Sequence, residues 1–235
     1  MNKIVNRTSV PHLSPDMKLY ELIDAAPVVL SLISRLGIRL PFGDMSIDEL
    51  CKRDGRSTEL MMMLCAMHID LTYRPCHEAL KPEMLGEVVG YLRASHRYYA
   101  ERMLPHALMH LEDILEHCDA LSQSLLRRFY SDYVTYITAH FEEEERDIFS
   151  AIDSVDHVAV TTFGDLEMPH SDIDDRSNDI ASLVVKSLPE AAPKALRCAM
   201  LKDVYELRDD LRRHSNIEMF LLRPLVEKFR MKNSN

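Results

Sequence analysis

The chain contains no tryptophan, only 6 glycines, and no apolar run longer than Leu60–Met67. So few glycines argue against a turn-rich β-sandwich, and a hydrophobic content of 46% argues against a disordered chain. A membrane-spanning helix needs roughly 18 consecutive apolar residues, and the polar start Met1–Asn6 lacks the apolar region of a signal peptide. We therefore expect a compact, all-α protein in the cytoplasm that does not contact a membrane.

Basic residues, paired cysteines and nucleotide motifs are also scarce. The 28 Lys and Arg residues stand against 38 Asp and Glu residues, and the resulting net charge of −10 argues against a nucleic acid partner. The 5 cysteines are far apart and form no CxxC motif, so we expect them to be reduced and buried as small hydrophobic residues. The chain has neither a Gly-rich phosphate loop nor a GxSxG motif, which disfavours phosphoryl and acyl transfer.

Helical patterns of two different lengths divide the chain. Up to about residue 80, short helical patterns alternate with Pro and Gly, and Ser46–Glu49 has the form of a capping box that starts one of these helices. The polar stretch Thr72–Pro82, with its two prolines, is typical of a linker. We expect a small N-terminal helical domain over residues 1–80 and a second domain over residues 81–235.

The second domain carries four long helical patterns, which predict a four-helix up-down bundle. They run from Pro82 to a turn near Asp119, from Leu121 to Ile152, from Pro169 to Ser187, and from the connection Pro189–Pro193 to Met231. The inward stripe predicted for the first pattern consists of Leu85, Val89, Leu92, His96, Met103, Ala107 and Ile114.

The HxxxE motif occurs twice in these patterns, as His140 with Glu144 and as His214 with Glu218. A spacing of four places both side chains of a pair on one helix face, within reach of one metal ion or of two neighbouring ions. For either pair alone, a solvated contact worth roughly a few tenths of a kcal/mol is the more common explanation of the spacing. Glu145 points about 100° away from Glu144, so we expect it in solvent or beside the ligands.

The bundle geometry favours the metal site. Two positions that are equally far from a hairpin turn lie at the same depth of an antiparallel helix pair, and His96 and His140 flank Asp119 at nearly equal distances along the chain. If the last two helices turn near Glu190, His170 and His214 flank that turn in a similar way. Both pairs are then roughly 30–36 Å from their turns. The predicted layer consists of His96, His140, Glu144, His170, His214 and Glu218.

A bound metal would remove the energetic penalty of this layer. Each buried carboxylate without a partner costs on the order of several kcal/mol. Carboxylates that bridge two ions, combined with imidazoles and open positions, suit a non-haem di-iron or di-manganese centre better than structural zinc. We therefore expect the layer to bind two non-haem iron ions, with manganese or zinc as substitutes.

Other histidines on the first long helix compete with His96. His110 and His117 follow it at multiples of seven, near the same helix face, and His106 forms an i,i+4 pair with His110. These residues lie near the turn at Asp119, where the last two helices offer no matching layer. We expect them to be ordinary surface or hydrogen-bonded histidines.

The segments around the predicted ligands resemble the hemerythrin-like bundle of the iron-sulphur cluster repair (RIC) di-iron proteins. The matching segments are Tyr91–Tyr99 with Leu104-Pro105, His140–Phe149, His170, and His214–Glu218. In that family, the histidines at these positions bind two irons and the two glutamates bridge them. Leu36–Ile38 and Ile47–Cys51 resemble the small helical domain that precedes the bundle in that family.

The chain departs from this family at several positions. Arg39–Asp44 occupies the segment where relatives carry adjacent cysteines, so we expect no thiol chemistry from it. Pro169 stands where relatives often have Glu, directly before the third-helix histidine. The Phe-Pro that commonly follows the HxxxE segments is replaced by Phe149-Ser150 in one helix and by Leu222–Pro224 in the other.

The resemblance implies a protein that binds or reacts with NO or O₂ and helps to repair iron-sulphur centres under nitrosative or oxidative stress, with iron-sulphur proteins among its partners. The same ligands support transport, sensing, reduction of NO or peroxide, and iron donation, so the sequence leaves open whether the protein is an enzyme. A second hypothesis is a hemerythrin-like iron or diatomic sensor, or a regulatory interaction protein without turnover. A third is a bundle without metal, which the burial penalty disfavours.

Overall fold

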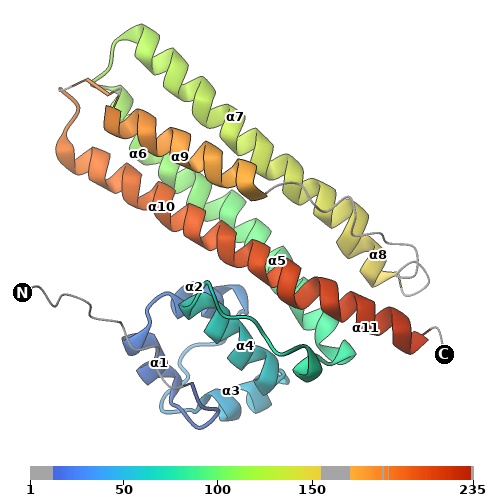
Figure 1. Ribbon diagram of the computed structural model, residues 1–235. Helices are drawn as coiled ribbons and strands as arrows, with labels where there is room; N and C mark the ends of the chain where they lie inside the picture. Colours follow the sequence, from blue (N-terminus) through green and yellow to red (C-terminus); the bar gives the residue numbers. More distant parts are fainter. Residues whose placement is uncertain (1–12, 155–169, 187, 190, 234–235) are drawn as a thin grey trace, which may run out of the picture.

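The computed structural model describes residues 13–154, 170–186, 188–189 and 191–233, and this part of the chain consists of helices and loops (Figure 1). The first long pattern forms η2 (Pro82–Met84), α5 (Leu85–Tyr98), η3 (Tyr99–Met103) and α6 (Leu104–Leu115). The second forms α7 (Ala120–Glu144), η4 (Glu145–Phe149) and α8 (Ser150–Asp153). The third forms α9 (His170–Lys186), and the fourth forms α10 (Lys194–Ile217), η6 (Glu218–Leu222) and α11 (Arg223–Asn233).

These four long elements form an antiparallel bundle, which confirms the predicted all-α, up-down fold (Figure 1). The turn between the first two lies at the predicted place: Asp119 is the N-cap of α7, and its Oδ1 accepts hydrogen bonds from the backbone N–H groups of Leu121 and Ser122, both at 3.0 Å. Helix α10 lies beside both α9 and α6. The predicted start of the third helix at Pro169 lies outside the described residues.

Four short helices precede the bundle: α1 (Leu19–Ala25), α2 (Val29–Arg35), α3 (Ile47–Asp54) and α4 (Thr58–Ile69). The capping box at the start of α3 is present, because Ser46 Oγ accepts from the Glu49 N–H at 3.2 Å and the Ser46 N–H donates to Glu49 Oε2 at 2.8 Å. Helix α3 ends at Gly55, whose φ of 67° is in the left-handed region that favours glycine. The segment after α4 contains the single turn η1 (His77–Ala79).

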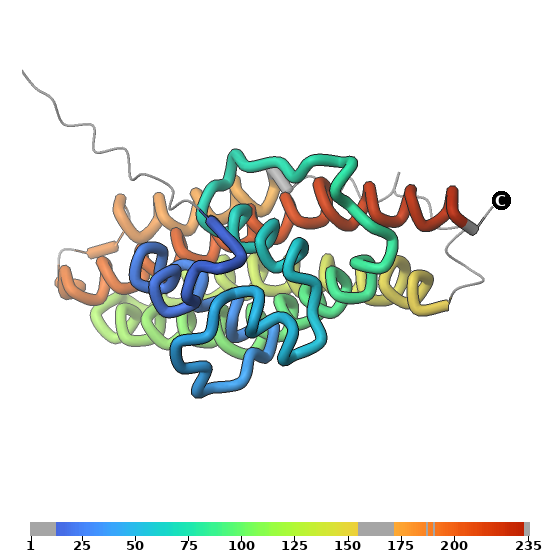
Figure 2. Tube along the Cα trace, turned by 90° about the horizontal axis from the view of Figure 1, so that it is seen from below, coloured from blue at the N-terminus to red at the C-terminus, as the bar shows by residue number. Residues whose placement is uncertain are grey.

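The short helices lie across one side of the bundle, next to α5 and α10 (Figure 2). Their buried side chains, among them Leu22 and Leu64, share one hydrophobic cluster with Leu92, Phe149 and Leu221 of the bundle. The half of the bundle nearest the Asp119 turn has a second cluster of its own, which includes Leu111, Ile137 and Leu207. The two clusters divide the bundle core along its length.

Three of the long elements contain a π-helical turn, η3, η4 and η6. Pro105 and Pro224 follow two of these turns, and a proline lacks the N–H that an α-helix needs and clashes with the carbonyl four residues earlier. After η4 the corresponding residue is Ala151, and the hydroxyl of Ser150 just before it donates to the Glu145 carbonyl at 2.8 Å. Each π turn adds one residue to its helix, and such turns often occur at functional sites.

Two further expectations can be compared with the fold. Among the described residues, none of the helices combines the length and the apolar character needed to cross a bilayer. Cys51 and Cys65 are buried as expected, but the expectation is wrong for Cys76 and Cys198, which are exposed. Cys198 lies off the buried stripe of α10 that begins at Met200, and Cys76 lies in the segment between α4 and η2.

Candidate metal centre

A layer of polar side chains separates the two hydrophobic clusters. On α5, His96 lies between Leu92 of the first cluster and Tyr99 of the second, and on α10 His214 lies between Leu211 and Ile217 in the same way. Glu144 occupies the corresponding level of the second long element. The five described members of the layer are all buried: His96, His140, Glu144, His214 and Glu218. The bundle core thus contains three imidazoles and two carboxylates at one level.

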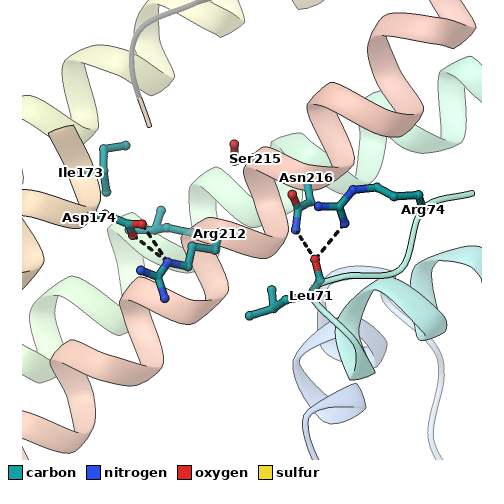
Figure 3. A pocket seen from close by; sticks show the side chains of 8 residues that line it. Leu71, Arg74, Ile173, Asp174, Arg212, Ser215 and Asn216 are labelled. Carbon is teal, nitrogen blue, oxygen red and sulfur yellow. Dashed lines mark hydrogen bonds and ion pairs between the residues drawn. The ribbon is translucent and has the colours of Figure 1, made fainter. Parts of the chain in front are cut away.

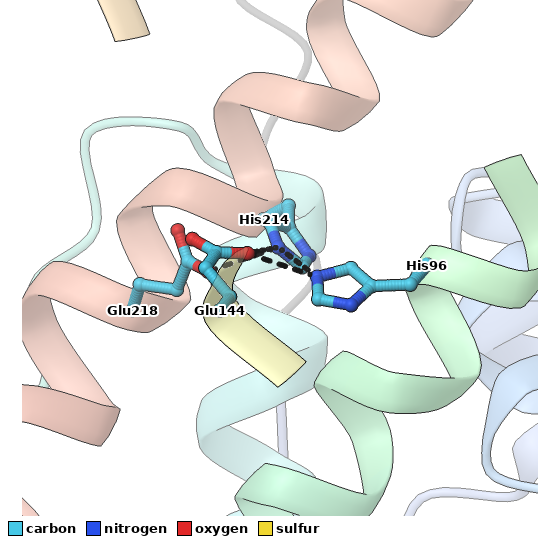
Figure 4. Close-up of side chains that lie close together, drawn as sticks. All are labelled: His96, Glu144, His214 and Glu218. Atoms are coloured by element: carbon cyan, nitrogen blue, oxygen red, sulfur yellow. Dashed lines mark hydrogen bonds and ion pairs between the residues drawn. The ribbon is translucent and has the colours of Figure 1, made fainter. Parts of the chain in front are cut away.

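Figure 4 shows four of these side chains, His96, Glu144, His214 and Glu218, with their donor atoms directed at one another. Glu144 is the centre: its Oε2 lies 3.1 Å from His96 Nε2 and 3.9 Å from His214 Nε2, and its Oε1 lies 3.1 Å from His140 Nε2. His214 Nε2 in turn lies 3.2 Å from His96 Nε2 and 3.0 Å from Glu218 Oε1. His96, Glu144, His214 and Glu218 each offer a ligand atom within 4.8 Å of the others.

This arrangement fits a cation better than a hydrogen-bond network. Two imidazole Nε2 atoms face each other, so at least one of them has to carry a proton if no cation lies between them. Both oxygens of Glu144 approach imidazole nitrogens, but neither accepts a hydrogen bond of good geometry from any described residue. His214 Nδ1 likewise forms no hydrogen bond with the described residues. Imidazole nitrogens with carboxylate oxygens are the donors that iron, manganese and zinc prefer.

When no cation is bound, protons on the imidazoles compensate part of the negative charge of the layer. Burial disfavours the charged form of Glu144, but His140, His214 and His96 outweigh it and hold the pKa of the carboxyl well below its usual value. Burial would likewise lower the pKa of His214, yet Glu218 and Glu144 raise it to about 10. At neutral pH the layer therefore holds at least one proton that a metal has to displace, which makes metal binding favourable at higher pH.

The six predicted ligands divide into five that the structure brings together and one that it does not describe. The backbone of His170 is the first residue of α9, but its side chain lies outside the described part of the chain. The competing histidines lie elsewhere: His106 and His110 face Asp203 of α10, and His117 is exposed near the Asp119 turn.

His96 is held by a chain of charged groups on its outer side. Its Nδ1 lies 3.1 Å from Glu145 Oε1, so the carboxylate beside Glu144 contacts a layer residue rather than the layer's centre. Arg93 holds Glu145 at 3.0 Å and Asp153 at 2.6 Å. A carboxylate on Nδ1 leaves the Nε2 lone pair free to face the layer, which is how ligating histidines are oriented in metal sites.

Aromatic rings surround the layer. The ring of Phe141 stacks on His96 with centroids 4.3 Å apart, and the ring of Phe149 lies 5.5 Å from His96 on a nearly parallel plane. Tyr99 and Phe141 approach His214 edge-on at 5.7 and 5.9 Å. These rings keep bulk water from the donor atoms and lower the local dielectric, which strengthens the interaction of the donors with a cation.

A buried polar network that sequence reasoning missed joins the layer to the short helices. Arg35 of α2 forms an ion pair with Asp210 of α10, one turn before His214, and both are buried. Arg35 also donates to the hydroxyls of Tyr91 at 3.0 Å and Tyr99 at 3.4 Å. The available signal was the spacing of four from Asp210 to His214, which continues the HxxxE periodicity backwards along one helix face.

Two surface pockets flank the centre. One of about 580 Å³ lies between the α5–η3 and α7–η4 segments and is lined by His96, Phe141 and Glu145, among others. The other, of about 370 Å³, contains none of the five layer residues (Figure 3). Its polar groups are engaged with one another: Arg212 pairs with Asp174 at 2.8 Å, and Asn216 and Arg74 donate to the Leu71 carbonyl. Only the first of these two pockets reaches a candidate ligand.

Comparison with known proteins identifies the family of the bundle. Residues 87–226, more than half of the chain, match the family model described as the hemerythrin HHE cation binding domain. The match covers the whole polar layer and His170. Neither a curated protein nor a solved structure matches the chain.

Proposed function

The chain belongs to the hemerythrin HHE cation-binding family, and from this membership and the buried polar layer we propose that it is a non-haem di-iron protein. In this proposal, His170 completes the layer and Glu144 and Glu218 bridge the two ions. The observation that carries the proposal is the convergence of buried imidazole nitrogens on a carboxylate whose oxygens lack well-formed hydrogen bonds among the described residues. Manganese or zinc would fit the same donors.

We propose NO or O₂ as the ligand. Bound iron would supply open coordination positions for such a molecule, and the residues of the chain control what reaches them. The surface pocket of about 580 Å³ is lined by His96 and by the Phe141 ring that stacks on it. Small, weakly polar molecules pass such an aromatic boundary more easily than charged ones, because they lose little hydration.

We propose that the protein uses this site in the cytoplasm to help repair iron-sulphur centres under nitrosative or oxidative stress. The wide spacing of the five cysteines and the lack of a CxxC motif fit a reducing compartment. Thiols of the N-terminal helices do not take part, since Cys51 is buried and burial raises its pKa to about 11. Iron or a diatomic ligand at the bundle layer is therefore the chemistry that repair would use.

The experiment loads the full chain with iron anaerobically and counts the bound iron. The loaded protein is then exposed to NO or O₂ and followed by its optical spectrum. Finally it is incubated with a [4Fe–4S] hydratase that NO has inactivated, and recovered hydratase activity is measured. We expect about two irons per chain, a spectral change with NO, and faster recovery than an equal concentration of free ferrous iron gives. Recovery no faster than with free iron would exclude repair by this protein.

A sensor without turnover is the second candidate, and the Arg35–Asp210 ion pair favours it. This pair connects α2 to the turn of α10 that carries His214, so a change at the layer has a direct route to the short helices. A sensor predicts that loading with iron or NO alters the protection of α2 and α4 against amide hydrogen exchange. If amide exchange in these helices is the same in the iron-free, the iron-loaded and the NO-treated protein, the sensor hypothesis is wrong.

A further inference from the structure

A second group of metal-binding side chains lies on the surface between α6 and α10. His106 and His110 follow each other by one helical turn on α6, and their rings are 4.7 Å apart. Asp203 of α10 faces both: its Oδ2 lies 3.2 Å from His106 Nδ1 and 2.5 Å from His110 Nδ1. All three residues offer ligand atoms within 4.8 Å of one another.

We propose that His106, His110 and Asp203 bind one Zn²⁺ ion, and that this ion clamps α6 to α10. Two imidazoles and one carboxylate occupy one face of an ion and leave the remaining positions to water. The hard ions Ca²⁺ and Mg²⁺ prefer a full set of oxygen ligands, which this group does not offer.

The geometry differs from that of an ordinary exposed ion pair. Both imidazoles direct the same atom, Nδ1, at a single oxygen of Asp203, and the Asp203 side chain is only 11% exposed. The two histidines are fixed on one face of a helix, so little side-chain entropy is lost when an ion joins them. His106 is 56% exposed and His110 19%, so water can complete the coordination of an ion from the outer side.

This site is separate from the buried centre. His106 and His110 follow His96 in the same long element, and the rise of a helix places them about 15–21 Å further along the bundle. None of the three residues takes part in the contacts of the polar layer, as far as the described residues show. Binding at the surface group can therefore be tested without disturbing the layer.

The test titrates the full chain with Zn²⁺ by calorimetry after anaerobic loading with iron, while the bound iron is monitored. We expect one Zn²⁺ per chain to bind without loss of iron. His106→Gln and Asp203→Asn should each weaken this binding by at least about tenfold, because each removes one of three ligands. His117→Gln is the matched control, since His117 is exposed near the end of the same helix and outside the group.

Several outcomes would overturn the proposal. One is Zn²⁺ uptake that is matched by iron loss, which would place the zinc at the buried layer. Another is equal Zn²⁺ affinity in His106→Gln and the unmodified protein. Because His106 is largely exposed, this variant should fold normally, and far-UV circular dichroism checks that it does. The difference between His106→Gln and His117→Gln decides the matter whether or not the layer holds iron.

Discussion

Two groups of histidines and carboxylates, the buried layer and the surface group, both take residues from the segments α5–α6 and α10–η6, and they differ chiefly in burial. His96 and His214 lie in the polar layer with exposed fractions of 5% and 2%, whereas the His106 side chain in the outer group is 56% exposed. Water can hydrate the outer group whether or not an ion is present. The inner group has exchanged water for aromatic rings, so its donors depend on one another and on a cation. Residue types alone therefore do not distinguish a site that requires metal from one that merely accepts it.

The π turn η3 is the local reason for the difference. In a continuous α-helix, His110 would lie within about 40° of His96, because the two heptads between them make nearly four turns. The additional residue of η3 rotates everything after it by about 100°, which takes His110 off the face that carries His96. Depth along the bundle and rotation about the helix act together, and both direct His110 toward Asp203 instead.

The largest expected effect is the loss of iron when a residue of the buried layer is replaced, while a replacement in the surface group leaves the iron content unchanged. His96→Ala should lose at least half of the bound iron after anaerobic loading, since a ligand is replaced by a methyl group. Glu218→Ala should behave in the same way, because it removes a carboxylate that we propose to bridge the two ions. His110→Ala should keep nearly all of its iron. Metal analysis with an optical spectrum measures this, and circular dichroism confirms folding. If His110→Ala loses iron while His96→Ala retains it, the layer is not the iron site.

A large effect on stability should follow when a buried ion pair is broken. Arg35→Ala removes the nearest cation of the buried Asp210 carboxylate and leaves it only Arg213, at 4.0 Å, so we expect a loss of about 3 kcal/mol in the free energy of unfolding. Arg212→Ala is the matched variant. Arg212 lies on the same helix as Asp210, and it forms a partly exposed ion pair with Asp174 of α9. This variant should cost no more than about 1 kcal/mol. Urea unfolding of both variants provides the comparison, and equal losses would mean that burial does not decide the strength of these pairs.

Acid should lower the free energy of unfolding through the buried ring of His68. Burial lowers the pKa of His68 from 6.5 to about 3, so the folded state keeps this ring neutral where the unfolded state already binds a proton. The stabilising contribution is complete above pH 6.5 and is lost as pH falls from 6.5 toward 3, by up to about 1.4 kcal/mol per pH unit. Urea unfolding of the metal-free protein between pH 7 and 5 measures this slope.

His68→Leu is the control for this pH dependence. It removes the titrating ring and its 2.7 Å contact with the Tyr91 hydroxyl, so it lowers stability at pH 7 but should flatten the slope below pH 6.5. The titrating groups of the polar layer are the same in both proteins, so their contribution cancels when the two pH slopes are subtracted. A slope identical to that of the unmodified chain would show that His68 is not held neutral.

The smallest effect concerns the outer group without metal. In the presence of a chelator, His110→Ala should change the free energy of unfolding by less than about 1 kcal/mol, because a part-exposed imidazole–carboxylate contact is compensated by water. Denaturant unfolding checks this value. A loss at least twice as large would mean that the contact with Asp203 is an essential part of the α6–α10 packing, and the contrast between the two groups would then be weaker.

Much of the architecture could be predicted from local patterns. The capping box at Ser46, the N-cap at Asp119 and the 3.6-residue periodicity each depend on neighbours within one or two turns, and all three appear in the structure. The shared depth of His96 and His140 followed from counting residues away from a turn. Met103, by contrast, belongs to the predicted inward stripe but is only half-buried; it is the last residue of the π turn η3, and the stripe is buried again at Ala107 and Ile114.

The sequence by itself determined the helices, their antiparallel order and the level at which imidazoles and carboxylates meet, since these follow from periodicity, caps and chain length. Only the tertiary structure decided which groups complete the centre. Arg35 comes from a helix 175 residues away from Asp210, and Glu145 contacts His96 from another helix, so no local pattern could pair them. Such contacts form because burying charged and polar groups is unfavourable unless they find partners, and the partners become known only when the helices have packed.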